Sequence, residues 1–577
     1  MRPLWFGPED RPLFGWLHLP EGGDARGAVL LCPTIGIEAV NARYAYKHLA
    51  DRLADAGLAC FRFDYDGTGD SAGQQNDPNR VQAWLNSIQL AMELLRGLGT
   101  DRIGVVGLRM GATLLAESFG SGPAVVDDLV LWDPCASGRS FLREQSALWA
   151  FAVGREAVGD GSIETPGLVY DKDTVTDMSP LAIANGDGPL AGRVLVLTRD
   201  GRNGDRRANE RLALPHTERV AIVGQEELVD VLPDAAKIPE ATITTIVEWL
   251  ASGAESGQAV VIDPDAVGRT VAVVGKTPDG APVEERAAWL GPLGLFGIVT
   301  SRVRPEATEG ESGAKEPPAI FFLNAGVIDH VGPAGLWVRL SRLWAEAGFL
   351  AIRLDLSGNG DSPLHPGQSG RVIFSSHHEQ DVIDALRAVS PQDPSNAVIV
   401  GLCSGGFNSL APAIELKVRG VCALNPILTF KDLDEKDGSG VDQGPGQTKG
   451  GMKGWVGKVP GYTVINRLSK RLPSSAWWII NRIAVEITPA RRLARVVDAG
   501  VDVLVIAGSD EGRWLRGGET RTLHRLEQTG RFRMEVIPGL EHTLFEHSTR
   551  EVALGILYDH VVGKFGAPAA AAAAAAR

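Results

Sequence analysis

The stretch VIVGLCSGGFNS, residues Val398–Ser409, begins in a short apolar run and continues into a pattern typical of a helix. A buried strand, a tight glycine-containing turn and a helix, in that order, can hold a nucleophilic side chain at the end of a sheet. Two side chains in this turn carry nucleophilic atoms, the Cys403 thiol and the Ser404 hydroxyl. The first question is which of the two the turn presents.

The spacing of small residues around the turn favours the cysteine. Because the chain reverses sharply, the residues two before and two after the nucleophile must be small. Around Cys403 these positions are Gly401 and Gly405, whereas around Ser404 the first of them is Leu402. We therefore expect Cys403 to be the nucleophile and the backbone N–H of Ser404 to stabilise an oxyanion.

The two halves of the chain repeat the same pattern. A loop of the form Asp-x-x-Gly-x-Gly-Asp-Ser occupies residues 64–71 in one half and 355–362 in the other, each time after an apolar run. Pro33 lies 31 residues before Asp64, and Asn324 lies 31 residues before Asp355. Equal spacing in two separate segments indicates that the halves are structural repeats.

Strands that alternate with helical patterns predict an α/β fold, in which helices cover both faces of a parallel sheet. At 577 residues the chain is too long for one hydrophobic core. We therefore expect two tandem domains, each a doubly wound, mostly parallel sheet with a lid insertion. The expected segments are a first domain over 1–255, a linker or extra strands over 256–285, a second domain over 286–566 with a lid at about 427–490, and an alanine-rich tail over 567–577.

Composition excludes several classes of function. The net charge of −14 argues against nucleic acid or an anionic membrane as the main partner. Five cysteines without a Cys-x-x-Cys pair indicate reduced thiols rather than a disulfide framework or a zinc site. The N-terminus lacks the features of a signal peptide, and no apolar run approaches the roughly 20 residues that cross a membrane. We expect a cytoplasmic protein without a membrane span, a metal or a cofactor.

A nucleophile turn of this kind needs an acid and a histidine further along the chain, in that order. The apolar run of VDVLVIAGSDEG ends near Asp510, with Glu511 beside it, and the run of FRMEVIPGLEHTLFE leads to His542. We expect Asp510 to orient His542, and His542 to take the proton of Cys403. Glu511 and His547 are the alternatives for the acid and the base.

Two further segments supply the rest of the expected site. A second N–H for the oxyanion should come from the loop after the apolar run AIFFLNAG, at Gly326 or Val327. The segment SSAWWIINRI follows a polar, glycine-rich stretch at 431–454 that could act as a lid and exclude water. Trp477 and Trp478 could line an acyl pocket, although two tryptophans near a helix can also serve packing alone.

Both halves resemble the α/β-hydrolase superfamily. In the first half, LVLWDPCASGRSFLREQSAL and GSIETPGLV are similar to serine aminopeptidase-type hydrolases, in particular exosortase-associated ones found with bacterial exopolysaccharide and natural-product genes. In the second half, GLCSG, LNPILTF and VIPGLEHTLF are similar to members with a cysteine nucleophile. The resemblance covers nearly the whole chain and implies the fold, but this fold hosts many chemistries and leaves the substrate open.

The first half departs from the pattern at both catalytic positions. Its turn, residues 107–111, carries Arg109 where the nucleophile should stand, and arginine stays protonated at neutral pH. Its late apolar run leads to Gln225, Glu226 and Glu227 in place of a histidine. We therefore expect an inactive domain. Arg109 would either attract a carboxylate or phosphate or form an internal salt bridge, with Asp64 or Asp200 as partner.

We expect the second half to be a cysteine-dependent acyltransferase. A Cys403 thiolate would take an acyl group from an acyl carrier protein or CoA as an enzyme thioester, and pass it to an amine or hydroxyl acceptor. The expected setting is bacterial natural-product or exopolysaccharide biosynthesis, and a homodimer is compatible with the sequence. One alternative is a thioesterase, esterase or lactone hydrolase with the same residues, and another is a non-catalytic tandem scaffold.

Overall fold

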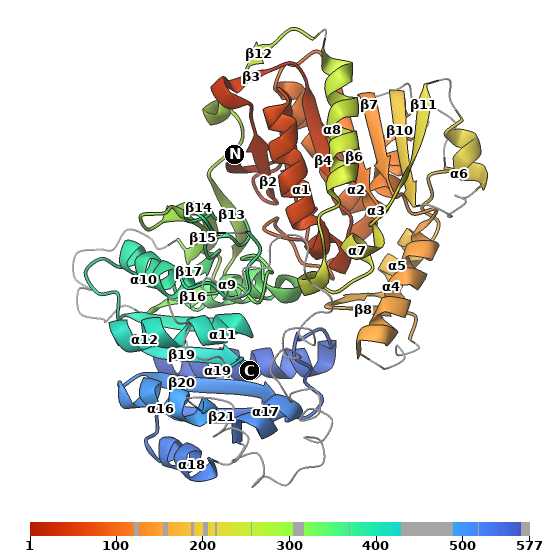
Figure 1. Ribbon diagram of the computed structural model, residues 1–577. Helices are drawn as coiled ribbons and strands as arrows, with labels where there is room; N and C mark the ends of the chain where they lie inside the picture. Colours follow the sequence, from red (N-terminus) through yellow and green to blue (C-terminus); the bar gives the residue numbers. More distant parts are fainter. Residues whose placement is uncertain are drawn as a thin grey trace. The chain divides into compact units, whose positions relative to one another are not determined.

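The computed structural model divides the chain into two compact units, Met1–Gly275 and Lys276–Arg577 (Figure 1). The division falls inside the segment 256–285 that the sequence marks as a linker or extra strands. The structure describes residues 1–120, 126–153, 160–185, 190–199, 206–213, 216–255, 257–303, 317–368, 370–428, 488–516 and 519–566. Most of the predicted lid at 427–490 and the whole tail at 567–577 lie outside these residues.

The first unit is built on an eight-stranded sheet in the order β1-β2-β5-β4-β6-β7-β10-β11. Strands β1 and β2 are antiparallel to their neighbours, and every pair from β5 to β11 is parallel. The strands are β1 (Arg2–Phe6), β2 (Leu13–His18), β4 (Ala28–Cys32), β5 (Ala59–Phe63), β6 (Ile103–Leu108), β7 (Val126–Trp132), β10 (Ala191–Arg199) and β11 (Thr217–Ile222).

Helices cover both faces of this sheet because alternate strand residues are apolar on each face. Leu30 and Val105 pack with α2 (Arg80–Gly97) and α3 (Met110–Phe119) on one face. Leu31 and Val106 pack with α1 (Ile37–Asp55) and α8 (Glu240–Ala254) on the other, and Figure 1 shows α1 and α8 side by side. The smaller elements are β3 (Asp24–Ala25), α4 (Gly138–Val153), β8 (Ile163–Thr165), β9 (Leu168–Tyr170), α5 (Lys172–Met178), α6 (Arg206–Arg211), α7 (Glu226–Val229) and β12 (Val260–Val261).

The second unit repeats this plan with eight strands of a nine-stranded sheet, in the order β14-β15-β17-β16-β18-β19-β20-β21, and β13, which ends at the unit boundary, is the ninth strand, beside β14. The pairs from β17 to β21 are parallel, while β14, β15 and β17 pair antiparallel. The strands are β13 (Val271–Lys276), β14 (Pro282–Leu290), β15 (Leu295–Arg302), β16 (Ala319–Phe322), β17 (Ala351–Leu354), β18 (Ala397–Leu402), β19 (Gly420–Leu424), β20 (Asp502–Gly508) and β21 (Phe532–Ile537).

The helices of the second unit also form two layers. One apolar cluster joins α9 (Leu336–Glu346) and α19 (His547–Phe565) to the sheet. Another joins α10 (His378–Val389), α12 (Leu410–Leu416), α16 (Pro489–Asp498) and α18 (Thr520–Gln528) to the opposite face. Two short helices, α11 (Ser404–Asn408) and α17 (Ser509–Arg516), follow β18 and β20 directly.

The predicted α/β fold with two tandem, doubly wound, mostly parallel sheets is confirmed. From β2 to β11 and from β15 to β21 the strands follow the same spatial order, with β4 matching β16 and β6 matching β18. In the first unit, α4, β8, β9 and α5 are inserted between the neighbouring strands β7 and β10, and their role as a lid stays a prediction. Among the described residues, no helix is long and apolar enough to cross a membrane.

Candidate active site

The nucleophile turn of the second unit has the sharp geometry that the sequence predicts. Cys403 lies between β18 and α11 with φ 57° and ψ −115°, a conformation that a side chain rarely adopts. A Cβ atom on Gly401 would lie 2.2 Å from the carbonyl carbon of Gly405. A Cβ atom on Gly405 would lie 2.6 Å from the carbonyl oxygen of Asn324. Both glycines are therefore required by close backbone approach, and they leave the Cys403 side chain only partly buried.

His542 lies next to Glu511 rather than next to Asp510. The Nδ1 atom of His542 is 3.2 Å from the Oε1 atom of Glu511. The Asp510 side chain is 79% exposed and lies 3.9 Å from the guanidinium of Arg513. Because successive residues of a helix point about 100° apart, only one of the two acids in the first turn of α17 can face the imidazole. The prediction that Asp510 orients His542 is replaced by Glu511, which the sequence left as the alternative.

The imidazole of His542 has a strongly raised pKa. Burial alone would lower the pKa, but the neighbouring Cys403 thiol and the Glu511 carboxylate outweigh it and raise the pKa of His542 to about 10. Burial likewise opposes ionisation of Glu511, yet its hydrogen bond with His542 lowers the pKa of that carboxyl overall. The Nε2 atom of His542 is buried and makes no hydrogen bond of good geometry to a described residue. This nitrogen is the one that remains for proton exchange with the thiol.

The backbone N–H groups near Cys403 differ in whether they are engaged. The Gly326 N–H donates to the Ser404 hydroxyl oxygen at 3.0 Å, so in this conformation it is committed to a side chain. The N–H groups of Ser404 and Val327 make no hydrogen bond to a described residue. Of the two loop residues that the sequence offers as the second oxyanion donor, Val327 is therefore the one that stays available.

Asn425 is a residue of the site that sequence reasoning missed. It follows β19 with φ 39°, and its side-chain oxygen accepts the Gly508 N–H at 2.8 Å. Its side-chain amide donates to the carbonyl oxygens of Glu541 and His542, both at 3.1 Å. One buried amide thus joins the end of β20, which leads to Glu511, to the loop that carries His542. The signal in the sequence was a polar residue directly after a buried strand, in LNPILTF.

The alternative base, His547, lies outside this arrangement. It occupies the first position of α19, and its Nδ1 atom is 2.9 Å from the guanidinium of Arg550. Trp477 and Trp478, expected to line an acyl pocket, lie outside the described residues.

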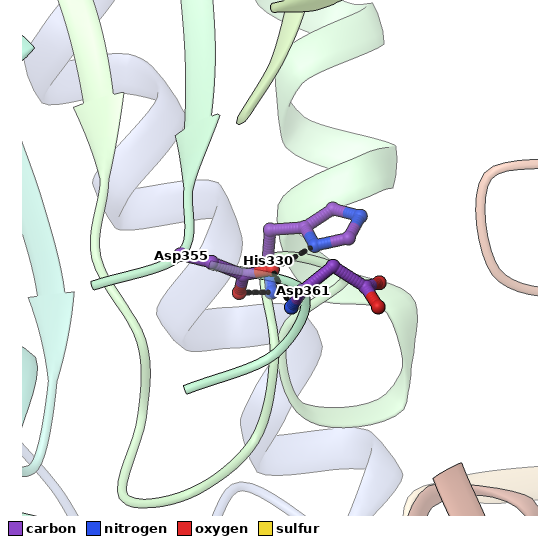
Figure 2. Close-up of side chains that lie close together, drawn as sticks. All are labelled: His330, Asp355 and Asp361. Atoms are coloured by element: carbon purple, nitrogen blue, oxygen red, sulfur yellow. Dashed lines mark hydrogen bonds and ion pairs between the residues drawn. The ribbon is translucent and has the colours of Figure 1, made fainter. Parts of the chain in front are cut away.

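His330, Asp355 and Asp361 form a buried cluster (Figure 2). The Nδ1 atom of His330 is 2.7 Å from Oδ2 of Asp355, and the Asp361 N–H donates to the same oxygen at 3.0 Å. Figure 2 shows the Asp361 carboxylate turned away from Asp355. One potential ligand atom of each residue lies within 4.8 Å of the others. The sequence predicted no metal site, and it offered His330 no role.

The corresponding turn of the first unit has almost the same backbone and a different environment. Arg109 has φ 52° and ψ −118°, and it is buried. Its guanidinium lies 3.2 Å from Glu38 and 3.5 Å from Asp133, and it also pairs with Glu144. Burial raises the pKa of Glu38, and Arg109 opposes that rise. Three carboxylates neutralise this arginine. Of the two predicted alternatives, Arg109 therefore forms the internal salt bridge and not an open anion site.

The partners that the sequence suggested for Arg109 are not the ones found. The carboxylate of Asp64 lies 3.4 Å from the guanidinium of Arg43, and Asp200 lies outside the described residues. At the position expected for a histidine, Gln225 is buried and accepts a hydrogen bond from the Trp132 indole at 2.9 Å. The neighbouring Glu226 and Glu227 are exposed.

Comparisons with known proteins agree with the fold. The family model described as "Serine aminopeptidase, S33" matches residues 23–158, and the one described as "Alpha/beta hydrolase family" matches residues 320–553. No curated protein matches the chain. Similar solved structures include Est1E from Butyrivibrio proteoclasticus, with 13% identity, a TM-score of 0.33, and coverage of 44% of this chain and 99% of that one.

Two peptidases from mycobacteria are also similar. A puromycin-hydrolyzing peptidase of Mycobacterium tuberculosis has 16% identity and a TM-score of 0.31, with coverage of 52% of this chain and 47% of that one. A proline iminopeptidase of Mycobacterium smegmatis has 14% identity and a TM-score of 0.30, with coverage of 44% and 99%. The two family matches include the two nucleophile turns, one in each unit. A family model of the α/β-hydrolase superfamily thus matches part of each unit, which supports a tandem α/β-hydrolase protein.

Proposed function

We propose that the second unit is an acyltransferase that uses the Cys403 thiolate as its nucleophile, with His542 as acid and base and Glu511 as the group that orients His542. The observation that carries the proposal is the arrangement of these three side chains. A thiol on a strained turn and a carboxylate act on one imidazole and raise its pKa to about 10. This is the arrangement that activates a thiol for attack on an acyl carbonyl.

In the first step the Cys403 sulfur attacks the carbonyl carbon of an acyl thioester, bound to a carrier protein or to CoA. The oxyanion that forms accepts hydrogen bonds from the backbone N–H groups of Ser404 and Val327. When the bond from carbon to the donor sulfur breaks, the departing thiolate takes a proton from the His542 imidazolium. The acyl group is then held as a thioester on Cys403.

In the second step an amine or hydroxyl acceptor attacks that thioester, and His542 takes the proton that the acceptor loses. The bond from carbon to the Cys403 sulfur breaks, which regenerates the thiolate and releases the acylated acceptor. Sulfur suits this reaction because exchange between two thioesters is close to thermoneutral. An enzyme thioester also reacts with amines more readily, relative to water, than an oxygen ester does.

A hydrolase with the same residues is the second candidate, since water can take the place of the acceptor. It is supported by the family model described as "Alpha/beta hydrolase family", which matches residues 320–553. A non-catalytic scaffold is the third, and the neutralised Arg109 supports it for the first unit alone. We propose that the first unit has no nucleophile, because the buried Cys135 beside Arg109 has its pKa raised by burial.

The test is intact-protein mass spectrometry after mixing the full chain with acyl-CoA and acyl-carrier thioesters of several lengths. We expect the mass of one acyl group on the wild type and on Cys422→Ala, a buried cysteine of the same unit, and no added mass on Cys403→Ala. Adding amines or alcohols then separates transfer from hydrolysis through the product. An unchanged turnover in Cys403→Ala would reject the proposal.

A further inference from the structure

The loop that carries Val327 is held at both ends by one buried carboxylate. We call residues 324–330 the oxyanion loop. At its start, the Asn324 amide donates to Oδ1 of Asp355 at 2.9 Å. At its end, the His330 N–H donates to the same oxygen at 2.7 Å, and the His330 ring lies 2.7 Å from Oδ2 (Figure 2). All three side chains are buried, so water does not compete for these bonds.

Further bonds make the oxyanion loop a closed unit that rests on the nucleophile turn. The Asn324 side chain also donates to the Ile328 carbonyl at 3.0 Å, across the loop, and accepts the Leu356 N–H at 2.7 Å. The Gly326 N–H donates to the Ser404 hydroxyl at 3.0 Å. Val327 lies between these fixed points. The place of its N–H relative to Cys403 is therefore set by Asp355, through the two ends of the loop.

The first unit has an aspartate at the position of Asp355, but that aspartate does not hold a loop in this way. Asp64 occupies the matching position in the Asp-x-x-Gly-x-Gly-Asp-Ser loop, and it accepts the Asp70 N–H at 3.0 Å and faces Arg43 at 3.4 Å. The residues at the spacing of Asn324 and His330 are Pro33 and Ala39, which have no side-chain donor. Among the described residues, no hydrogen bond joins the Asp64 side chain to residues 33–39.

The geometry points to His330 and Asp355 as positioning residues that hold the Val327 N–H at the oxyanion of the acyl-transfer reaction. This inference rests on the proposed function of Cys403. His330 donates from Nδ1 to Asp355 and closes the far end of the oxyanion loop. Neither side chain needs to touch the acyl donor, so their effect reaches the reaction only through the backbone of the loop.

The experiment compares two reactions of the same thiol in the full chain. Iodoacetamide alkylates Cys403 by displacement at a saturated carbon, where no oxyanion forms. An acyl thioester found in the mass-spectrometric test acylates Cys403 through an oxyanion. We expect His330→Ala to slow acylation by roughly 10- to 100-fold, since loss of one full oxyanion donor costs about 10²- to 10³-fold. Alkylation should stay within about two-fold of wild type. The dependence of the acylation rate on the concentration of acyl donor should be unchanged.

Two controls separate positioning from general damage. His330→Asn keeps a donor near the place of Nδ1, and we expect it to restore most of the acylation rate. Asp355→Asn should behave like His330→Ala, whereas Asp64→Asn, the matched change in the first unit, should leave both reactions unchanged. Thermal unfolding of each variant confirms that the full chain is folded.

Several results would overturn the inference. One is acylation of His330→Ala at the wild-type rate. Another is a loss of alkylation in His330→Ala as large as its loss of acylation. Loss of wild-type acylation on treatment with EDTA would show that His330, Asp355 and Asp361 hold a divalent ion instead. A wild-type Cys403 that is alkylated but accepts no acyl group would reject the proposed function, and the inference with it. Acylation of the wild type combined with no effect of His330→Ala would reject the inference alone.

Discussion

The two nucleophile turns share a backbone and differ in nearly everything around it. Arg109 and Cys403 have φ values of 52° and 57° and ψ values of −118° and −115°. In both turns, a Cβ atom on the second glycine would meet the carbonyl of the loop after the first central strand, at 2.3 Å for Gly111 and 2.6 Å for Gly405. The strained conformation is therefore a property of the fold. On its own it does not mark a reactive residue.

The two turns differ in the charged and titratable side chains that surround them. In the first unit a permanent cation lies among three carboxylates, all fixed by ion pairs. In the second unit an imidazole lies between a thiol and a carboxylate, and both neighbours raise its pKa. We expect the ion pairs of Arg109 to stabilise the first unit, and the groups around His542 to serve acyl transfer in the second.

The largest effect should come from the nucleophile itself. We expect Cys403→Ala to lower acyl transfer by at least about 10⁴-fold, because loss of a covalent nucleophile removes the whole pathway through the acyl-enzyme. The measurement is turnover of the acyl thioester found by mass spectrometry. As a control, Cys135→Ala at the turn of the first unit should leave turnover within about two-fold. A larger loss in Cys135→Ala than in Cys403→Ala would reverse the roles of the two units.

The acid should have the next largest effect. We expect Glu511→Gln to lower acyl transfer by roughly 10²- to 10⁴-fold, because the imidazole loses the carboxylate that orients and charges it. Asp510→Asn is the matched control, since Asp510 is exposed and precedes Glu511 on the same helix turn. It should change turnover by less than about two-fold. Equal losses in both variants would contradict the assignment of Glu511.

The position of the acid shows where sequence reasoning reaches its limit. Strand order, the glycine frame and the nucleophile turn could be predicted, because periodicity and close packing act over a few residues and leave a clear pattern. The choice between Asp510 and Glu511 depends on how α17 is rotated about its axis. That rotation depends on packing against β21, which follows α17 only after the intervening helix α18.

The buried polar partners were harder still to predict. Asn425 joins the end of β20 to a loop, both more than 80 residues away from it, and His330 meets Asp355 across 25 residues. The partners of Arg109 come from α1, from the end of β7 and from α4, so no local spacing indicates them. Each of these residues is an ordinary polar residue in the sequence. It acquires a role only because a buried donor or acceptor must find a partner.

The ion pairs of Arg109 should have a smaller effect, on stability rather than chemistry. We expect Arg109→Met to lower the free energy of unfolding of the first unit by about 3–5 kcal/mol, because Glu38 would remain buried without its cation. Hydrogen exchange of amides in β6 and β7 measures this change. Glu38→Leu added to Arg109→Met should recover part of the loss. Alkylation of Cys403 should stay unchanged, and a first unit as stable as wild type would show that the ion pairs contribute nothing.

The smallest effect concerns the pKa of His542. We expect its imidazole to titrate with a midpoint near pH 10 by NMR, so that the protonated form persists through neutral pH. Burial opposes that charge, whereas Cys403 and Glu511 favour it. Cys403→Ala and Glu511→Gln should therefore each move the midpoint down by about one unit or more, and each unit corresponds to about 1.4 kcal/mol. His547 at the start of α19 gives a reference resonance that neither variant should move.

The same pKa fixes how acyl transfer depends on pH. Because the departing thiolate needs a proton from the imidazolium, we expect turnover to fall as pH rises through about 10, where His542 loses that proton. Alkylation of Cys403 by iodoacetamide releases iodide and needs no such proton, so it should not fall with turnover. A fall in both reactions at the same pH would indicate unfolding of the second unit. A turnover that keeps rising above pH 10 would mean that the donor leaves without help from His542, and the imidazole would then serve only to hold the thiolate.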